Sequence, residues 1–299
     1  MSEASTFDAL IPAAMAEKAA QAGVKKAQSS FVTLFALGVL AGAFIAIGGL
    51  FSTVATAGAT GMLPYGVIRT IAGLAFGLGL IMVVVGGAEL FTGNTLIVMA
   101  FASGKVSLTA LLRNWAIVYV SNFVGAVLTA ALVFAANHYM AGQGAVGLNI
   151  LSIGETKTGL AFVPALAAGI LCNTLVCMAV WLCFSARTTT DKILAIIPPI
   201  TAFVAASFEH SIANMYFIPL ALFVKDGAPN AFWDLIQKTP ADYPHLTWAN
   251  FASSLVPVTI GNIIGGAVMV GLVYWLIYLR QKPRTESAIQ PGAAPVDKR

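Results

Sequence analysis

Charged side chains are scarce in this chain. Of its 299 residues only 9% are Asp, Glu, Lys or Arg, whereas 59% are hydrophobic. A soluble domain carries about a quarter charged residues, so a water-soluble globular fold is excluded. Cysteine is also rare, and Cys172, Cys177 and Cys183 have neither metal-site spacing nor a pairing pattern. We expect these three to be small packing residues, and we expect no metal ion and no cofactor.

Catalytic motifs are missing as well. The sequence has no His-Glu-x-x-His, no Gly-x-Ser-x-Gly and no glycine-rich phosphate loop. His138 and His245 fall in expected outer loops, which leaves His210 as the one histidine inside an apolar run. Glu209 precedes it, but adjacent positions of a helix do not face one another. We therefore expect no enzyme, and the net charge of +4 indicates no nucleic-acid partner.

Long apolar runs are what the sequence does have. Stretches of about twenty apolar residues cross a bilayer as helices, and runs this uniform are not barrel strands. We predict an all-α membrane protein with six transmembrane spans, two of them broken. The spans are expected at 31–55, 67–102 with a break, 115–136, 159–185, 193–224 with a break, and 249–279.

The distribution of Lys and Arg indicates the orientation in the membrane. With six spans, twelve of the 16 Lys and Arg residues fall on the side that carries both termini, which makes that side cytoplasmic.

We divide the chain into a cytoplasmic amphipathic helix at 1–28, a transmembrane domain at 29–280 and a disordered tail at 281–299. The first segment lacks the apolar core of a signal peptide. It fits a helix lying on the membrane surface and a gating or docking element equally well.

Two polar interruptions occur at matching positions in the two halves. Glu89 and Asn94 interrupt the second apolar run, and Glu209 and Asn214 interrupt the fifth, each pair as Glu-x-x-x-x-Asn. Asn-x-x-Gly sequences follow in the same order, beginning at Asn122 and Asn262. Broken spans in corresponding positions are typical of an internal repeat. We predict non-helical breaks at 89–94 and 207–214, related by a pseudo-two-fold axis in the membrane plane.

Residues at the breaks are candidates for two different roles. We expect Glu89 and Glu209 to be structural, each satisfying the backbone N–H groups that a broken helix frees. Thr92 and His210 could hydrogen-bond a small anion that has lost its water. Asn173 and Asn262 add neutral donors, although helix–helix hydrogen bonding is the commoner fate of such a residue.

Three runs of the sequence closely resemble the formate/nitrite transporter family. They are Glu-Leu-Phe-Thr-Gly-Asn at 89–94, Phe-Glu-His-Ser-Ile-Ala-Asn at 208–214, and Pro-Val-Thr-Ile-Gly-Asn-Ile-Ile-Gly-Gly at 257–266. Residues 7–15 and 173–177 look most like the bacterial formate channels. The resemblance extends from about residue 7 to residue 279, which is essentially the whole folded chain.

The resemblance implies a fold and a function. The expected fold is aquaporin-like, with six helices in an inverted 3+3 repeat. The expected assembly is a homopentamer in the bacterial cytoplasmic membrane, with one pore in each protomer. The expected substrates are formate and related small monovalent anions, with transport that is pH-dependent and proton-linked through a central histidine. Formate channels have Asp-Leu-Phe-Thr-Ser where this chain has Glu-Leu-Phe-Thr-Gly at 89–93, so nitrite and hydrosulfide stay open as alternatives, with a neutral-solute channel a more distant one.

The resemblance also assigns residues to the pore. It makes His210 the central histidine and Thr92 its partner, and our hypothesis is that this pair protonates or neutralises an anion between two apolar constrictions. The other pore positions that it implies are Asn173, Asn262 and the outer lysine Lys157. The constriction positions are Phe76 and Phe203 toward the outside, and Leu80, Leu90 and Val176 toward the cytoplasm.

Overall fold

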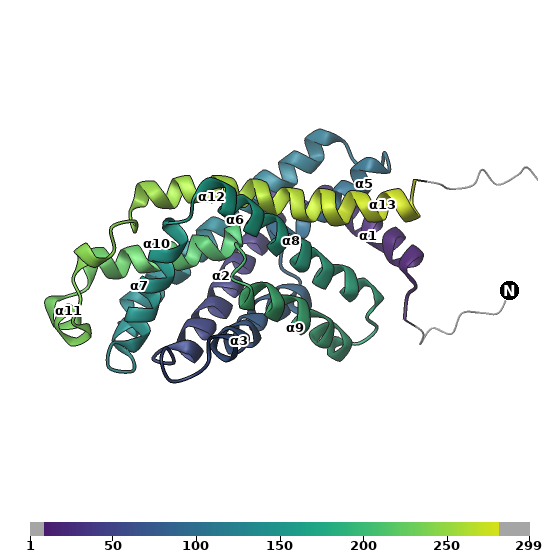
Figure 1. Cartoon of the computed structure of the whole chain (residues 1–299). Helices are drawn as coiled ribbons and strands as arrows, with labels where there is room; N and C mark the ends of the chain where they lie inside the picture. Colours follow the sequence, from purple (N-terminus) through teal and green to yellow (C-terminus); the bar gives the residue numbers. More distant parts are fainter. Residues whose placement is uncertain (1–8, 281–299) are drawn as a thin grey trace, which may run out of the picture.

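Membrane-length helices dominate the structure, a computed structural model that describes residues 9–280 (Figure 1). Five helical segments are long and apolar enough to cross a bilayer. They are α2 (Phe31–Thr56), α3 (Tyr65–Gly86), α6 (Leu108–Ala135), α8 (Phe162–Ser185) and the segment Trp248–Tyr278. The predicted disorder of 281–299 and the first eight residues of the predicted N-terminal segment lie outside the described residues.

The two predicted broken spans are present. After α3 the chain leaves helical geometry and resumes as α4 (Phe91–Asn94), a short 3-10 segment (Thr95–Ile97) and α5 (Val98–Ala102). The second break separates α9 (Thr189–Ala205) from α10 (Ser211–Gly227). Both breaks are shorter than predicted, because helix already begins at Phe91 and Ser211. The prediction that 91–94 and 211–214 are non-helical was therefore wrong.

The last span is one long helix with a change of pitch. It runs as α12 (Trp248–Ile263), a π-helical segment (Ile264–Leu272) and α13 (Val273–Tyr278). A π-helix is rare, and its hydrogen bonds join residues five apart in the chain rather than four. Gly266 lies in it, close to Thr95 and Cys177, so this segment lies against the 3-10 segment that follows the first break.

Helix starts follow from local capping. Ser107 accepts a hydrogen bond from the backbone N–H of Ala110 at 3.2 Å and begins α6. Ser30 and Thr247 cap α2 and α12 in the same way, and Thr188 forms a capping box with Asp191 at the start of α9. A side-chain oxygen at this position satisfies an N–H group that has no partner within the helix. The third span consequently starts at residue 108 rather than at the predicted 115.

The two halves of the chain repeat one arrangement of helices. In the first half α2 packs against α3 and α6, and in the second half α8 packs against α9 and α12. Each half opens with a shorter helix, α1 (Pro12–Ala27) or α7 (Ala145–Thr158). The sequence did not indicate α7, because it is too short and too polar to register as a span. The predicted inverted 3+3 repeat is confirmed, with α7 as an addition.

The first and last described helices lie at the same end of the molecule. Figure 1 shows α1 beside α13, far from α11 (Asn230–Ile236) at the opposite end, and α1 contacts α13. Met15, Ala16 and Ala19 of α1 are buried against α5, α8 and the last span. The N-terminal helix is therefore packed onto the ends of the transmembrane helices, with Met15, Ala16 and Ala19 on its buried face.

Candidate functional site

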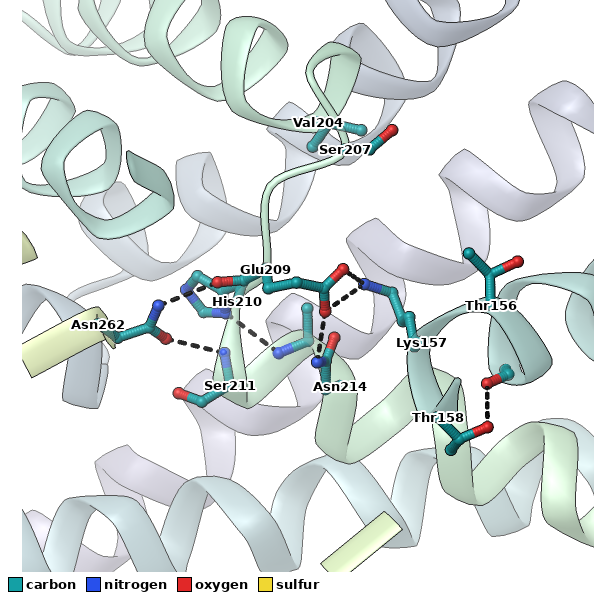
Figure 2. A network of polar contacts seen from close by, with 12 residues as sticks. Thr156, Lys157, Thr158, Val204, Ser207, Glu209, His210, Ser211, Asn214 and Asn262 are labelled. Atoms are coloured by element: carbon teal, nitrogen blue, oxygen red, sulfur yellow. Dashed lines mark hydrogen bonds and ion pairs between the residues drawn. The ribbon is translucent and has the colours of Figure 1, made fainter. Parts of the chain in front are cut away.

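Each break is held by an asparagine from a distant helix. Asn262 of the last span accepts a hydrogen bond from the N–H of Ser211 at 2.9 Å, and its amide donates to the carbonyl of Glu209 at 2.9 Å (Figure 2). The same amide also donates to the carbonyl of Gly169 at 2.9 Å. Asn122 of α6 makes the same three contacts in the first half. Its partners are the N–H of Phe91 and the carbonyls of Glu89 and Gly38. The Asn-x-x-Gly repeat in the sequence thus marks the residues that close the two breaks.

The structure corrects the role expected for the two glutamates. The freed N–H groups of Phe91 and Ser211 bind the asparagines, not the carboxylates. Glu209 instead pairs with Lys157, whose Nζ lies 2.9 and 3.0 Å from its two carboxylate oxygens. The amide of Asn214 donates to the same carboxylate at 2.7 Å (Figure 2). Glu209 is structural as expected, but it acts by tying the break to α7 and to the following half-helix.

Lys26 is the counterpart of Lys157, and its role was not predicted from the sequence. Its Nζ lies 3.0 Å from Glu89 and 2.8 Å from Asn94. The amide of Asn94 donates to Glu89 at 2.7 Å, as Asn214 donates to Glu209. A signal was present, because Lys26 and Lys157 each stand five residues before the first residue of the following long helix, Phe31 and Phe162.

Two cavities approach the centre from opposite sides. One cavity, about 330 Å³, lies at the α1 end and is lined by Lys26 and Glu89, and it is named the inner cavity after the orientation that the sequence predicts. The outer cavity, about 410 Å³, is lined by Lys157 and Glu209. The same Lys–Glu pair therefore faces opposite sides in the two halves, as an inverted repeat requires.

Apolar side chains lie where the two cavities approach one another. Phe76 and Phe203 line the outer cavity and pack edge to face, with ring centroids 5.6 Å apart. Leu80 and Leu90 line the inner cavity. All four are buried. Val176, the fifth predicted constriction residue, is buried and lines neither cavity among the described residues.

His210 and Thr92 lie between the two cavities and touch. Nε2 of His210 lies 3.0 Å from Oγ1 of Thr92. Nδ1 of the ring accepts a hydrogen bond from the N–H of Ala213 at 3.1 Å, so it caps α10. Because Nδ1 is an acceptor here, the proton of the neutral ring is on Nε2. The one N–H donor of the neutral imidazole thus points at Oγ1 of Thr92, and His210 also lines the outer cavity.

The two predicted pore asparagines lie elsewhere. Asn173 of α8 is fully buried, and its amide donates to the carbonyls of Asn262 and Thr92 at 2.6 and 3.2 Å. Asn262 closes the second break. Neither lines a cavity among the described residues. Both contact the backbone that carries Thr92 and His210, so they fix the position of that pair.

Basic side chains line both cavities. Lys18 and Lys192 join Lys26 in the inner cavity. Burial, and then the nearby charges of Arg187 and Lys192, lower the pKa of Lys18 below its ordinary 10.5. Arg69 lines the outer cavity and donates through Nη2 to the carbonyl of Val204 near the end of α9. Both approaches to the centre therefore favour anions.

The chain has two inverted broken spans and two opposed cavities that approach one another at apolar side chains. Helical membrane proteins with this architecture are channels and transporters. A model of the formate/nitrite transporter family matches residues 13–276. The chain belongs to this family. It is similar to formate channel FocA of Escherichia coli strain K12, with 46% identity over 276 residues, covering 92% of this chain and 96% of that protein. It is 37% identical to formate channel FocB of the same strain over 281 residues, with 93% and 98% covered.

Solved structures agree. A pentameric formate channel with formate bound matches with a TM-score of 0.80 and 46% identity, covering 84% of this chain and 98% of that chain. An ion channel of the same family matches with a TM-score of 0.75 and 26% identity, covering 88% and 98%. The predicted family and fold class are confirmed, and the relatives are channels and transporters rather than enzymes.

Proposed function

We propose that this protein is a channel for formate and related small monovalent anions. The observation that carries the proposal is the contact between Thr92 and His210 at the point where two oppositely directed cavities approach one another. The similarity to formate channels supports formate as the first substrate. Nitrite and hydrosulfide are the alternatives, since both are small monovalent anions of weak acids.

His210 acts in this proposal as a hydrogen-bond donor. An anion that passes the phenylalanine and leucine side chains loses most of its water, and Nε2–H of the ring replaces part of it. If that proton moved fully to formate, the ring would be left anionic unless Nδ1 gained a proton. Nδ1 accepts the Ala213 N–H, so net protonation of the substrate requires that hydrogen bond to open. The geometry supports stabilisation of the anion by a hydrogen bond from Nε2–H, with net proton transfer as a second, pH-dependent step that requires the Nδ1 hydrogen bond to open.

The remaining pore residues act around this pair. Phe76 and Phe203 form the outer constriction, and Leu80 and Leu90 the inner one. Asn173 and Asn262 hold the backbone of the pair in place. Lys157 and its counterpart Lys26 stabilise the breaks through their glutamates.

The assembly and orientation follow the same similarity. We propose a homopentamer with one pore in each protomer, in a bacterial cytoplasmic membrane with both termini cytoplasmic. The shared end of α1 and α13 and the basic inner cavity support that orientation. Native mass spectrometry tests the assembly, and a dimer or tetramer would rule it out.

Flux into proteoliposomes tests the substrate. Formate, nitrite, hydrosulfide and glycerol are compared at two pH values. We expect formate to enter fastest and more quickly at the lower pH. Faster entry of nitrite or hydrosulfide would reassign the substrate, and entry of glycerol without any anion would indicate a neutral-solute channel.

A further inference from the structure

Arg69 stands on the face of α3 that lines the pore. Phe76 is two helical turns further along the same helix, and both residues line the outer cavity. At 1.5 Å per residue, Arg69 lies about 10 Å outside the phenylalanine constriction along the helix axis. An anion entering from the outside therefore passes Arg69 before it meets the apolar side chains.

Arg69 supplies the net charge of the outer cavity. The charged residues that line it are Arg69, Lys157 and Glu209. Lys157 and Glu209 neutralise each other, with side chains only 15% and 5% exposed. Arg69 forms no ion pair with any residue in 9–280. The lysine that the resemblance placed in the pore is therefore compensated, and the arginine is not.

The guanidinium group has a donor to spare. Nη2 is held by the carbonyl of Val204, whereas Nε is buried and has no hydrogen-bond partner among the described residues. A buried donor without a partner is unfavourable. The hydroxyls of Tyr65 and Ser207, whose oxygens are 3.4 Å apart, line the same cavity. A planar oxyanion matches the fork of an arginine better than a spherical ion does.

We propose that Arg69 forms a capture site for small monovalent oxyanions in the outer cavity, with the hydroxyls of Tyr65 and Ser207 beside it. The site rests on the proposed function, because it holds the anion that the pore then conducts. It acts by concentrating carboxylate or nitrite outside Phe76, so its effect is on apparent affinity rather than on passage through the constriction.

Binding tests the site without any transport. The melting temperature of the full chain in nanodiscs is measured with increasing sodium formate, against sodium chloride at equal ionic strength. We expect formate to raise the melting temperature of the wild type and not of Arg69→Gln. Lys238→Gln is the matched control, because it removes one exposed cation that does not line the cavity, and it should keep the wild-type response.

Saturation of flux separates capture from a purely structural role. In Arg69→Gln the half-saturating external formate concentration should rise by about tenfold, the effect of losing one charge-assisted hydrogen bond. The rate at saturating formate should stay within about twofold of the wild type, as expected when only binding before the constriction is lost. Arg69→Lys keeps the charge but not the planar fork, so its half-saturating concentration should fall between the two, and this variant also serves if Arg69→Gln does not fold.

Different results overturn the two proposals. If formate does not raise the melting temperature of the wild type, or raises that of Arg69→Gln equally, the capture site is ruled out. An unchanged half-saturating concentration in a folded variant removes it as well. If the wild type binds formate through Arg69 but conducts none, the capture site stands and the proposed channel function fails.

Discussion

Thr92 and His210 are 118 residues apart in the chain, and Oγ1 of one lies 3.0 Å from Nε2 of the other. Thr92 follows the first break and His210 ends the second. Each break is held by its own asparagine, Asn122 or Asn262. The contact therefore joins the two halves of the repeat at their centre, and the direction of the imidazole donor depends on both halves being correctly placed.

The pH dependence of formate flux should reside in His210. His210→Asn should keep the fold, because an amide oxygen can still accept the Ala213 N–H, but it removes the imidazole, the ring through which a proton can pass to formate. We expect this variant to lose the pH dependence of formate flux into liposomes. Thr92→Val removes only the hydroxyl, so it should weaken selectivity between anions and change the pH profile less. A pH profile in His210→Asn identical to the wild type would exclude the histidine from the mechanism.

Asn122 and Asn262 should matter equally for stability. Replacing either by Leu removes the partner of one N–H group and one carbonyl group at a break, those of Phe91 and Glu89 or those of Ser211 and Glu209. Each unpaired buried group costs about 1–3 kcal/mol, so both variants should unfold at clearly lower temperature than the wild type. Asn230→Ala, on the exposed start of α11, is the control and should change little. A wild-type melting temperature in either Leu variant would contradict the proposed role of that asparagine.

The two lysine–glutamate pairs should differ in strength. Lys157 and Glu209 are 15% and 5% exposed, whereas Lys26 and Glu89 are 34% and 12% exposed. Lys157→Gln leaves a more deeply buried carboxylate unpaired, so it should destabilise the protein by about 3 kcal/mol or more, and Lys26→Gln by less. The double variant Lys157→Gln with Glu209→Gln should recover most of the loss. Equal effects of the two single variants on thermal unfolding would refute this ranking.

Lys18 should make the free energy of unfolding depend on pH in the alkaline range. Burial and the neighbouring Arg187 and Lys192 lower its pKa below 10.5, so between the lowered value and 10.5 the unfolded chain binds more protons than the folded one. Stability therefore rises with pH through that window. Lys18→Gln should lose this increment in thermal unfolding measured from about pH 8 to pH 11. Lys25→Gln removes an exposed charge from the same helix, and this variant should keep the rise in stability with pH.

The sequence by itself determined the spans and the repeat. Apolar runs of bilayer length and the duplicated Glu-x-x-x-x-Asn are local features, because a helix in lipid satisfies its own backbone and a polar interruption is unfavourable wherever it falls. These features located both breaks to within a few residues and singled out Thr92 and His210. They could not show how far each break extends, since α4 and α10 begin where Asn122 and Asn262 meet the chain from another helix.

Tertiary structure decided which partners the polar residues have. Glu89 and Glu209 looked like caps of the freed amides, but the inverted packing places an asparagine on those amides and a lysine on each carboxylate. It also neutralises Lys157 and leaves Arg69 as the uncompensated charge in the outer cavity. Such pairings depend on which helices pack side by side across the repeat. The local sequence around a buried charge does not identify its partner, because the energy of that charge is set by groups that are distant in sequence and close in space.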